Sequence, residues 1–438
     1  AINKAASSSY SAWQLVSYLG RVNYNYKEKY FVTFTGRSDG SSRFGKNNKW
    51  GYFPSGALAW NINKENFLKG VTPISALKLR LSAGITGNQE IGVYQSLSNI
   101  ATFKYILGDQ VVIGGAPGRI ANDDLTWEKT TQYTGAFDLA LFEDRINLSA
   151  DFYYKKTTDL LLSVSIPATS GHLTALQNYG SVENKGIELT LNTINTKGLF
   201  NWNTNIVFST NKNKILSLGE GIDYIISDPS IAKVGEAVGS FYVLKTDGVF
   251  KSTDDIANLP KNKANTLPGY QRYIDVNQDG AITQAGDRTI VGNAQPKFIF
   301  GITNNFSYKI FDLSFLLQGS YGNKLYNYTA AYLNLGTGYT NATTRLLNRW
   351  TPSNENTDVQ RAIEDPAVLP SIPERLMKAV KIKQLRLYVS AQNLITLTDY
   401  TGYDPEASRN EQTTLTQGYD NAVYPISKTV LGGLSITF

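Results

Sequence analysis

Apolar and polar residues alternate over many long segments of this chain. Residues 77–88 show the pattern most clearly: the apolar set is Leu77, Leu79, Leu81, Ala83 and Ile85, and the polar set is Lys78, Arg80, Ser82, Gly84 and Thr86. Successive side chains of a β-strand point to opposite faces. The alternation therefore predicts a strand with one apolar and one polar face.

The same alternation predicts eleven further strands. The twelve predicted segments are 16–26, 30–37, 51–62, 77–88, 130–142, 145–156, 186–195, 200–210, 297–308, 311–319, 385–393 and 424–438. Most are at least as long as the roughly 9–11 residues that a tilted strand needs to cross a bilayer, whereas an ordinary strand has about 5–6. Alternation alone is also compatible with a half-exposed soluble sheet. The length and the repetition favour membrane strands.

The connections between these segments are alternately short and long. Short turns lie at 27–29, 143–144, 196–198 and 309–310, and long connections at 38–49, 89–127, 157–181, 211–296 and 321–381. This up-and-down pattern is typical of an outer-membrane barrel, with short periplasmic turns and long extracellular loops. We therefore predict an all-β fold, a transmembrane antiparallel up-and-down β-barrel.

The last predicted strand reaches the final residue, Phe438. An aromatic side chain suits the membrane–water boundary, and the last strand of a barrel must pair along its whole length. Its one predicted partner in this chain is 385–393. We expect its other edge to lack a partner within this chain.

The composition of the chain excludes several kinds of structure and partner. The 438 residues include 27 Tyr, 19 Phe and 6 Trp but only 18% charged residues. No stretch approaches the roughly 18 consecutive apolar residues of a membrane helix. The absence of Cys excludes disulfides and thiolate metal sites. The net charge of +6 comes from scattered Lys and Arg, so nucleic acid is not an expected partner. Residues 1–9 do not resemble a signal peptide, so we expect the natural N-terminus upstream.

Several local motifs, taken together, are specific. They are YLGRVNY (18–24), TGRSDGSSRFG (35–45), WGYFPS (50–55), SAGITGNQ (82–89), GSVENKGIE (180–188), KTDGVF (245–250) and LYVSAQNL (387–394). The set resembles the SusC/RagA family of TonB-linked outer-membrane transporters over nearly the whole chain.

The resemblance implies the C-terminal barrel portion of a 22-stranded transporter in a Gram-negative outer membrane. Residues 1–438 would be that portion alone, with the plug domain, the TonB-contacting segment and the early strands absent. The family implies nutrient import energised through the TonB complex, with a SusD-like surface lipoprotein that captures glycans (oligosaccharides) or peptides. The alternatives are a passive porin or surface-adhesin barrel, or a soluble all-β carbohydrate-binding protein.

One segment departs from the family pattern. After residue 365 the family usually has another full strand, but Pro366, Pro370 and Pro373 exclude a central strand here. Segments 311–319 and 385–393 would then run in the same direction. A deleted strand, omitted residues or another crossing segment would explain this, and we favour an omission or a local deletion.

Residues 275–287 resemble a calcium-binding loop. Asp275, Asn277 and Asp279 occupy positions 1, 3 and 5, Gly280 occupies position 6, and the carbonyl of Ala281 is at position 7. Position 12 is Gly286 instead of Glu, so Asp287 is the candidate closing ligand. The alternative is a polar turn that binds nothing. Calcium is the only cofactor that the sequence suggests.

Other candidate residues carry weaker signals. Loop tyrosines could stack on substrate or anchor and pack the loops: Tyr321, Tyr326, Tyr328, Tyr332, Tyr339, Tyr400 and Tyr403. The polar strand faces carry charges for the lumen wall or the substrate: Arg21, Arg37, Lys78, Arg80 and Asp151. His172 is the only histidine, which argues against a catalytic triad. We predict that the chain is not an enzyme.

Overall fold

The computed structural model describes residues 10–334, 341–362, 379–385, 389–392, 395–398, 400, 418–420 and 429–432. It divides into two compact units. Unit 1 comprises residues 1–188 and 215–223, and unit 2 comprises residues 189–214 and 224–438. Nearly all of the regular structure is β-strand, and the described residues contain one α-helix, α1 (Tyr328–Leu333). No helix among them has the length and apolar character needed to cross a membrane.

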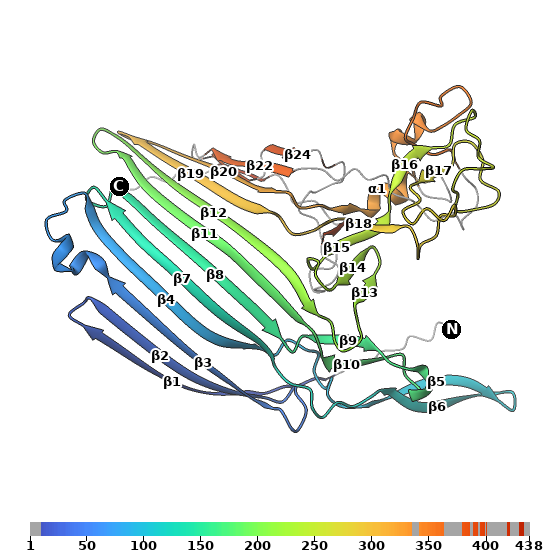
Figure 1. Ribbon diagram of the computed structural model, residues 1–438, viewed down its shortest axis with the longest axis horizontal. Coiled ribbons are helices and arrows are strands. Elements are labelled where there is room, and N and C mark those ends of the chain that lie inside the picture. The colour runs from blue at the N-terminus through green and yellow to red at the C-terminus, as the bar shows by residue number, and fades with distance from the viewer. Residues whose placement is uncertain are drawn as a thin grey trace. The chain divides into compact units, whose positions relative to one another are not determined.

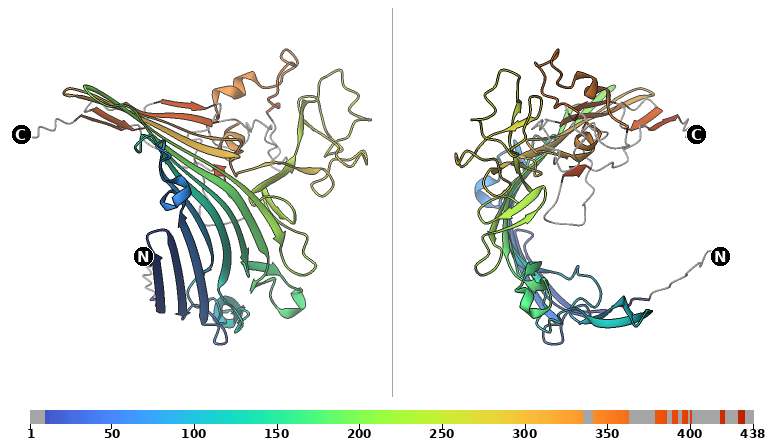
Figure 2. Two further views of the ribbon diagram at one scale, coloured as in Figure 1. Left: turned by 60° about the vertical axis from the view of Figure 1, so that its left-hand side comes forward. Right: turned by 90° about the vertical axis from the view of Figure 1, so that its right-hand side faces the viewer.

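Unit 1 is built on consecutive antiparallel strands. They are β1 (Leu15–Tyr26), β2 (Tyr30–Ser41), β3 (Trp50–Asn61), β4 (Ile74–Asn88), β7 (Glu128–Leu141) and β8 (Ile146–Thr158). They lie side by side in this order and form a curved wall (Figures 1 and 2). β11 (Ser181–Thr196) begins in unit 1 and continues into unit 2. The corresponding predicted strands are thus confirmed, with ends shifted by a few residues.

The predicted division into two faces is also confirmed in unit 1. Leu58 on β3 pairs with Leu81 on β4, and their side chains are 55% and 49% exposed. On the alternate positions, Lys78 pairs with Asp138 on β7, which in turn pairs with Ser149 on β8. One face therefore presents large apolar side chains outward and the other is polar.

The longer connections of unit 1 contain strands that the alternation did not predict. The strands are β5 (Asn99–Leu107), β6 (Gln110–Arg119), β9 (Leu161–Ser165) and β10 (Thr174–Asn178). The connections of unit 1 also contain the 3₁₀ helices η1 (Ile62–Lys64), η2 (Asn66–Leu68) and η3 (Ala168–Ser170). β5 pairs with β6 and β9 with β10, each as a separate hairpin. The predicted long connections 89–127 and 157–181 therefore contain hairpins of their own. β5 and β6 carry apolar residues on both faces, so they lack the alternation on which the prediction relied.

Unit 2 has a second run of antiparallel strands. Their order is β12 (Phe200–Ser217), β19 (Phe298–Tyr308), β20 (Phe311–Tyr321), β22 (Ala379–Leu385) and β24 (Ile395–Thr398), with the last residues of β12 in unit 1. Stacked rings lie along it: Phe298 packs on Tyr321 with centroids 5.1 Å apart, and Trp202 packs on Phe306 at 5.7 Å. Aromatic pairs of this kind stabilise neighbouring strands.

The predicted loops of unit 2 also contain strands. Between β12 and β19 lie a four-stranded sheet, β13 (Tyr224–Ser227), β14 (Ser230–Lys233), β15 (Ser240–Leu244) and β18 (Arg288–Asn293), and a pair, β16 (Thr246–Val249) and β17 (Gln271–Tyr273). Later elements are β21 (Tyr326–Asn327), η4 (Thr344–Asn348), β23 (Val389–Gln392), β25 (Tyr419–Asp420) and β26 (Thr429–Gly432). These strands are mostly only four to six residues long, too short for the pattern of a membrane strand.

Another crossing segment, one of the three explanations given for the direction of the strands, is present. β22 pairs antiparallel with β20, and β24 pairs antiparallel with β22, so a return strand exists just after the proline-rich segment. The three prolines themselves lie outside the described residues. The predicted strand 385–393 corresponds to parts of two strands, because Leu385 ends β22 whereas β23 pairs with β26. This pairing agrees with the predicted contact of the last segment, and the end of that segment lies outside the described residues.

Candidate functional site

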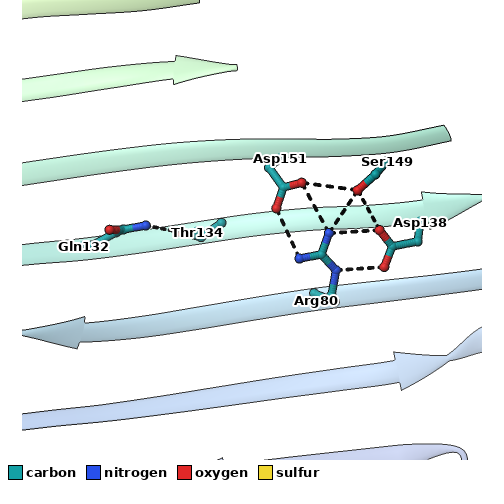
Figure 3. Close-up of polar contacts among 6 residues, drawn as sticks. All are labelled: Arg80, Gln132, Thr134, Asp138, Ser149 and Asp151. Atoms are coloured by element: carbon teal, nitrogen blue, oxygen red, sulfur yellow. Dashed lines mark hydrogen bonds and ion pairs between the residues drawn. The ribbon is translucent and has the colours of Figure 1, made fainter. Parts of the chain in front are cut away.

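The polar face of unit 1 carries a four-residue charged cluster centred on Arg80. The Nε and Nη2 atoms of Arg80 donate to the two carboxylate oxygens of Asp138 at 2.8 and 2.9 Å, and Nη1 donates to Asp151 at 3.2 Å. Ser149 donates to Asp138 at 2.7 Å and lies 3.2 Å from Nη2 of Arg80 (Figure 3). The paired planar geometry fixes the orientation of the guanidinium.

The strand register explains why these residues meet. Arg80 on β4 pairs with Ala136 on β7, and Ala136 pairs with Asp151 on β8. The short, buried Ala136 leaves room for Arg80 to reach across β7 to Asp151. The cluster contains one cation and two carboxylates, so it leaves one negative charge on the polar face.

A hollow of about 510 Å³ lies on the same face, across β2, β3, β4 and β7. Hydroxyl groups line part of it, from Thr33, Thr35, Ser55 and Ser82. Arg37 also lines it and donates to Asp39 through Nε at 2.7 Å. The hollow offers many hydrogen-bonding groups, which suits a polar ligand or a polar segment of protein.

An apolar cluster holds several loops of unit 1 together at one end of this hollow. Its buried residues are Phe44, Phe53, Ile91, Leu125 and Trp127. Trp127 donates from its indole nitrogen to the carbonyl of Lys49 at 3.1 Å. An added Cβ at Gly51 or Gly87 would lie 2.4 or 2.1 Å from the Phe53 ring, so only glycine fits there. Three of the specific sequence motifs therefore meet in one packed cluster.

In unit 2, the predicted calcium loop adopts a tight polar turn. Asp275 accepts hydrogen bonds from the backbone of Gln278 at 2.7 Å and of Gly280 at 2.9 Å. Gly280 has φ +83°, a conformation that favours glycine. Asp279 accepts from the backbone of Ala281 at 2.9 Å and from the amide of Asn277 at 2.8 Å.

Asp287 is the buried anchor of this loop. Its carboxylate accepts hydrogen bonds from the backbone of Val276 at 2.9 Å and of Thr283 at 2.7 Å. Burial raises the pKa of Asp287, but these backbone hydrogen bonds outweigh burial and hold that pKa below its ordinary value. The Asp275 side chain also lowers the pKa of Asp287. Within the described part of the chain, no three His, Asp or Glu side chains are close enough to hold a metal ion.

Unit 2 also contains a polar pocket, which no sequence motif predicts. It has a volume of about 490 Å³ and lies among Asp247, Lys251, Arg272, Glu355 and Thr357. Arg272 donates to Asp247 at 2.7 Å, and Glu355 accepts from the backbone of Ser252 at 3.2 Å. These residues are up to about a hundred positions apart, so no local motif could reveal the pocket.

A family model described as "TonB dependent receptor-like, beta-barrel" matches residues 3–394. This chain belongs to that family.

Named relatives agree with the assignment. TonB-dependent receptor P3 of Formosa agariphila is 40% identical over 475 residues, covering 100% of this chain and 47% of the relative. TonB-dependent receptor SusC of Bacteroides thetaiotaomicron is 34% identical over 464 residues, covering 97% of this chain and 44% of the relative. This chain thus spans about half the length of the curated relatives it matches.

Solved structures show the same fold. The structure of the RagAB peptide transporter superposes with a TM-score of 0.79 at 26% identity, covering 95% of this chain and 46% of that one. The RagAB peptide importer in the open-open state gives 0.78, also at 26% identity. The predicted resemblance to the SusC/RagA family and the outer-membrane location are confirmed.

The family assignment indicates what each face of unit 1 contacts. The apolar face of unit 1 faces lipid, and the polar face with the Arg80 cluster and the hollow faces the interior of the barrel. A soluble carbohydrate-binding protein is thereby excluded. The relatives are receptors of this transport family, which agrees with the prediction that the chain is not an enzyme.

The other predicted site residues are distributed over several elements. Tyr321 and Tyr326 stack on Phe298 and Phe241, and Tyr400 donates to Asp420, so these three make packing contacts. Tyr328 and Tyr332 lie in α1, whereas Tyr339 and Tyr403 lie outside the described residues. His172 lies in the turn after η3. Of the predicted polar-face charges, only Arg80 and Asp151 contact each other.

Proposed function

We propose that this chain forms part of a TonB-dependent receptor that imports a nutrient, either an oligosaccharide (glycan) or a peptide, through the outer membrane. The observation that carries the proposal is its similarity to SusC and to the RagAB peptide transporter over nearly its whole length. The polar wall around Arg80 and the hydroxyl-lined hollow support passage of a polar solute. The chemistry is binding, gating and passage.

A SusD-like surface lipoprotein is the proposed partner, and the TonB complex is the proposed source of energy. The long extracellular connections, with their packed cluster and polar pocket, supply ordered surface for such a lipoprotein. A passive porin or an adhesin would need neither partner.

Uptake by cells that express the complete receptor tests this function. We expect labelled oligosaccharides or labelled peptides to enter, and entry to stop when a protonophore dissipates the proton gradient that drives TonB. Cells lacking the receptor are the control. Uptake that persists after the gradient is dissipated would identify a passive pore, and absence of uptake of both substrate classes would reject the proposal.

We also propose that the loop 275–287 binds calcium. The spacing of its oxygen-bearing residues supports it, because Asp275, Asn277 and Asp279 occupy positions 1, 3 and 5 of a calcium loop and Asp287 follows position 12. Asn277, Asp279 and the Ala281 carbonyl would supply further oxygen ligands, and Asp279 would give up its present hydrogen bonds.

Calorimetric titration of the calcium-free complete receptor tests this second proposal. We expect heat of binding and a higher unfolding temperature in the parent, both lost in Asp275→Asn and kept in the matched control Glu236→Gln, which changes an exposed carboxylate of the same unit. A parent receptor without either response to calcium would disprove it.

A further inference from the structure

The lipid-facing surface of unit 1 contains a groove of about 840 Å³ that crosses β2, β3, β4, β7 and β8. Gly56, Ala83 and Gly135 form its floor on three adjacent strands. Larger side chains form its walls: Phe34, Leu58, Leu81, Tyr133, Phe152 and Tyr154. The register places these residues on one face, because Phe34 pairs with Gly56 and Leu81 pairs with Gly135.

The floor of this groove is not covered by other side chains of unit 1. A Cβ added at Gly56 would meet only the Thr33 carbonyl at 3.9 Å, and one added at Gly135 would meet only Leu81 at 3.6 Å. Neither glycine has a φ that requires glycine. An unfilled apolar groove forfeits dispersion contacts unless hydrocarbon fills it. On this face the available hydrocarbon is a lipid acyl chain.

Three lysines lie on the same face, toward the extracellular ends of the strands. Thr131 pairs with Lys156, two residues along from the pair Tyr133 and Tyr154, and Lys129 follows on β7. Lys185 on β11 lines the groove. The order from groove to strand end is therefore apolar wall, then tyrosine, then lysine.

This basic rim keeps a net positive charge. Lys129 pairs with Asp159 at 3.6 Å and Lys185 with Glu183 at 3.2 Å. Lys156 is exposed and makes no ion pair within the described part of the chain. Three lysines against two carboxylates leave a charge of +1 near the level of lipid head groups. A cation there complements a phosphate.

We propose that the groove binds one acyl chain of a phosphate-bearing lipid of the outer leaflet, with the phosphate at Lys156 and Lys185. The apolar groove retains the acyl chain, and the lysines favour lipids that carry a phosphate. Because this site faces the membrane, it is independent of the nutrient that the receptor carries.

Lipid retention by the complete receptor tests the proposal. The detergent-purified receptor is stripped of lipid, equilibrated with either phosphatidylglycerol or diacylglycerol of the same chains, and analysed by native mass spectrometry. We expect the parent to retain phosphatidylglycerol about fivefold better than diacylglycerol. This is the effect predicted for one unpaired basic residue near an anionic head group. Inorganic phosphate alone should not displace it.

Two sets of variants separate the two halves of the site. Gly56→Leu with Gly135→Leu fills the groove and should reduce retention of both lipids, whereas Lys156→Gln with Lys185→Gln should remove only the preference for phosphatidylglycerol. The matched control for the groove is Gly36→Leu, which lies on the same face outside the groove and has nothing within 4 Å of its Cβ position. The matched control for the lysines is Lys104→Gln on β5. Both controls should retain the two lipids as the parent does.

Either of two results would overturn the proposal. One is equal retention of the two lipids by the parent, which would indicate bulk membrane lipid only. The other is undiminished retention after the groove is filled. The groove and lysine variants are independent, so a folding failure in one set leaves the other as the test.

Discussion

The guanidinium of Arg80 reaches across β7 and places its Nη1 atom 3.2 Å from the carboxylate of Asp151 on β8. It also makes two shorter bonds to Asp138, at 2.8 and 2.9 Å. One side chain thus ties together three strands of the wall inside the receptor. The two carboxylates are unequal partners, because the bonds from Arg80 to Asp151, at 3.2 and 3.3 Å, are longer than those to Asp138. Ser149 likewise donates to Asp138 at 2.7 Å but to Asp151 only at 3.3 Å.

This inequality predicts different costs for two matched substitutions. Asp138→Asn should lower the free energy of unfolding by about 1–2 kcal/mol, since it weakens the paired bonds to Arg80. Asp151→Asn should cost about 0.5–1 kcal/mol, because its bonds are longer and these side chains are about one-third exposed to screening water. Thermal unfolding of the complete receptor checks the order, and a larger effect at Asp151 would contradict it.

Gly87 should be intolerant of even one methyl group. A Cβ there would lie 2.1 Å from the Phe53 ring, so Gly87→Ala should displace Phe53 and destabilise the receptor by about 1–3 kcal/mol. Gly36→Ala is the matched control, since nothing lies within 4 Å of its Cβ position. Thermal unfolding together with tryptophan fluorescence, which reports Trp127 among others, measures both. Equal stability of the two variants would contradict the packing described for this cluster.

Glu65 should make the receptor sensitive to acid. It accepts hydrogen bonds from Tyr30 at 2.6 Å, Lys29 at 2.9 Å and Trp60 at 3.2 Å, and these lower the pKa of Glu65 from 4.5 to about 2. Because its pKa is lowered on folding, the charged Glu65 stabilises the folded receptor at pH values above 4.5. This stabilisation is lost as the pH falls from 4.5 to about 2.

Acid unfolding curves of Glu65→Gln measure this contribution. The variant should be less stable than the parent at neutral pH, and the difference should shrink as the pH falls through that window. Glu143→Gln changes an exposed carboxylate in another short turn and should follow the parent curve. A stability difference that does not change with pH would show that the Glu65 charge is unimportant.

Asp287 should be needed to fold its loop even without calcium. Asp287→Asn replaces one acceptor oxygen by a donor, so either Val276 or Thr283 loses the partner of its backbone N–H, at a cost of about 1–3 kcal/mol. Limited proteolysis in the presence of a chelator should show faster cleavage near residues 275–287. Glu236→Gln, which changes an exposed carboxylate elsewhere in the same unit, is the control and should be cleaved at the parental rate.

The alternation of residues predicted the long strands because their two faces meet different environments. Leu58 and Leu81 lie on one face and Lys78 lies on the other, so apolar and polar residues alternate in the sequence. The β5–β6 hairpin was missed because both of its faces are apolar, and β13–β18 were missed because their strands are short. The return strand β22 was missed because three prolines precede it, and proline removes a backbone donor that a central strand needs.

The sequence by itself determined the strand faces, the family and the calcium-like loop spacing, because each depends on residues close together in the chain. Only the tertiary structure decided which distant residues meet. Ala136 gives Arg80 access to Asp151, Gly87 gives Phe53 its place, and three small residues on three strands open the lipid-facing groove. These arrangements depend on the register between strands, and register sets which side chains lie opposite each other across a sheet.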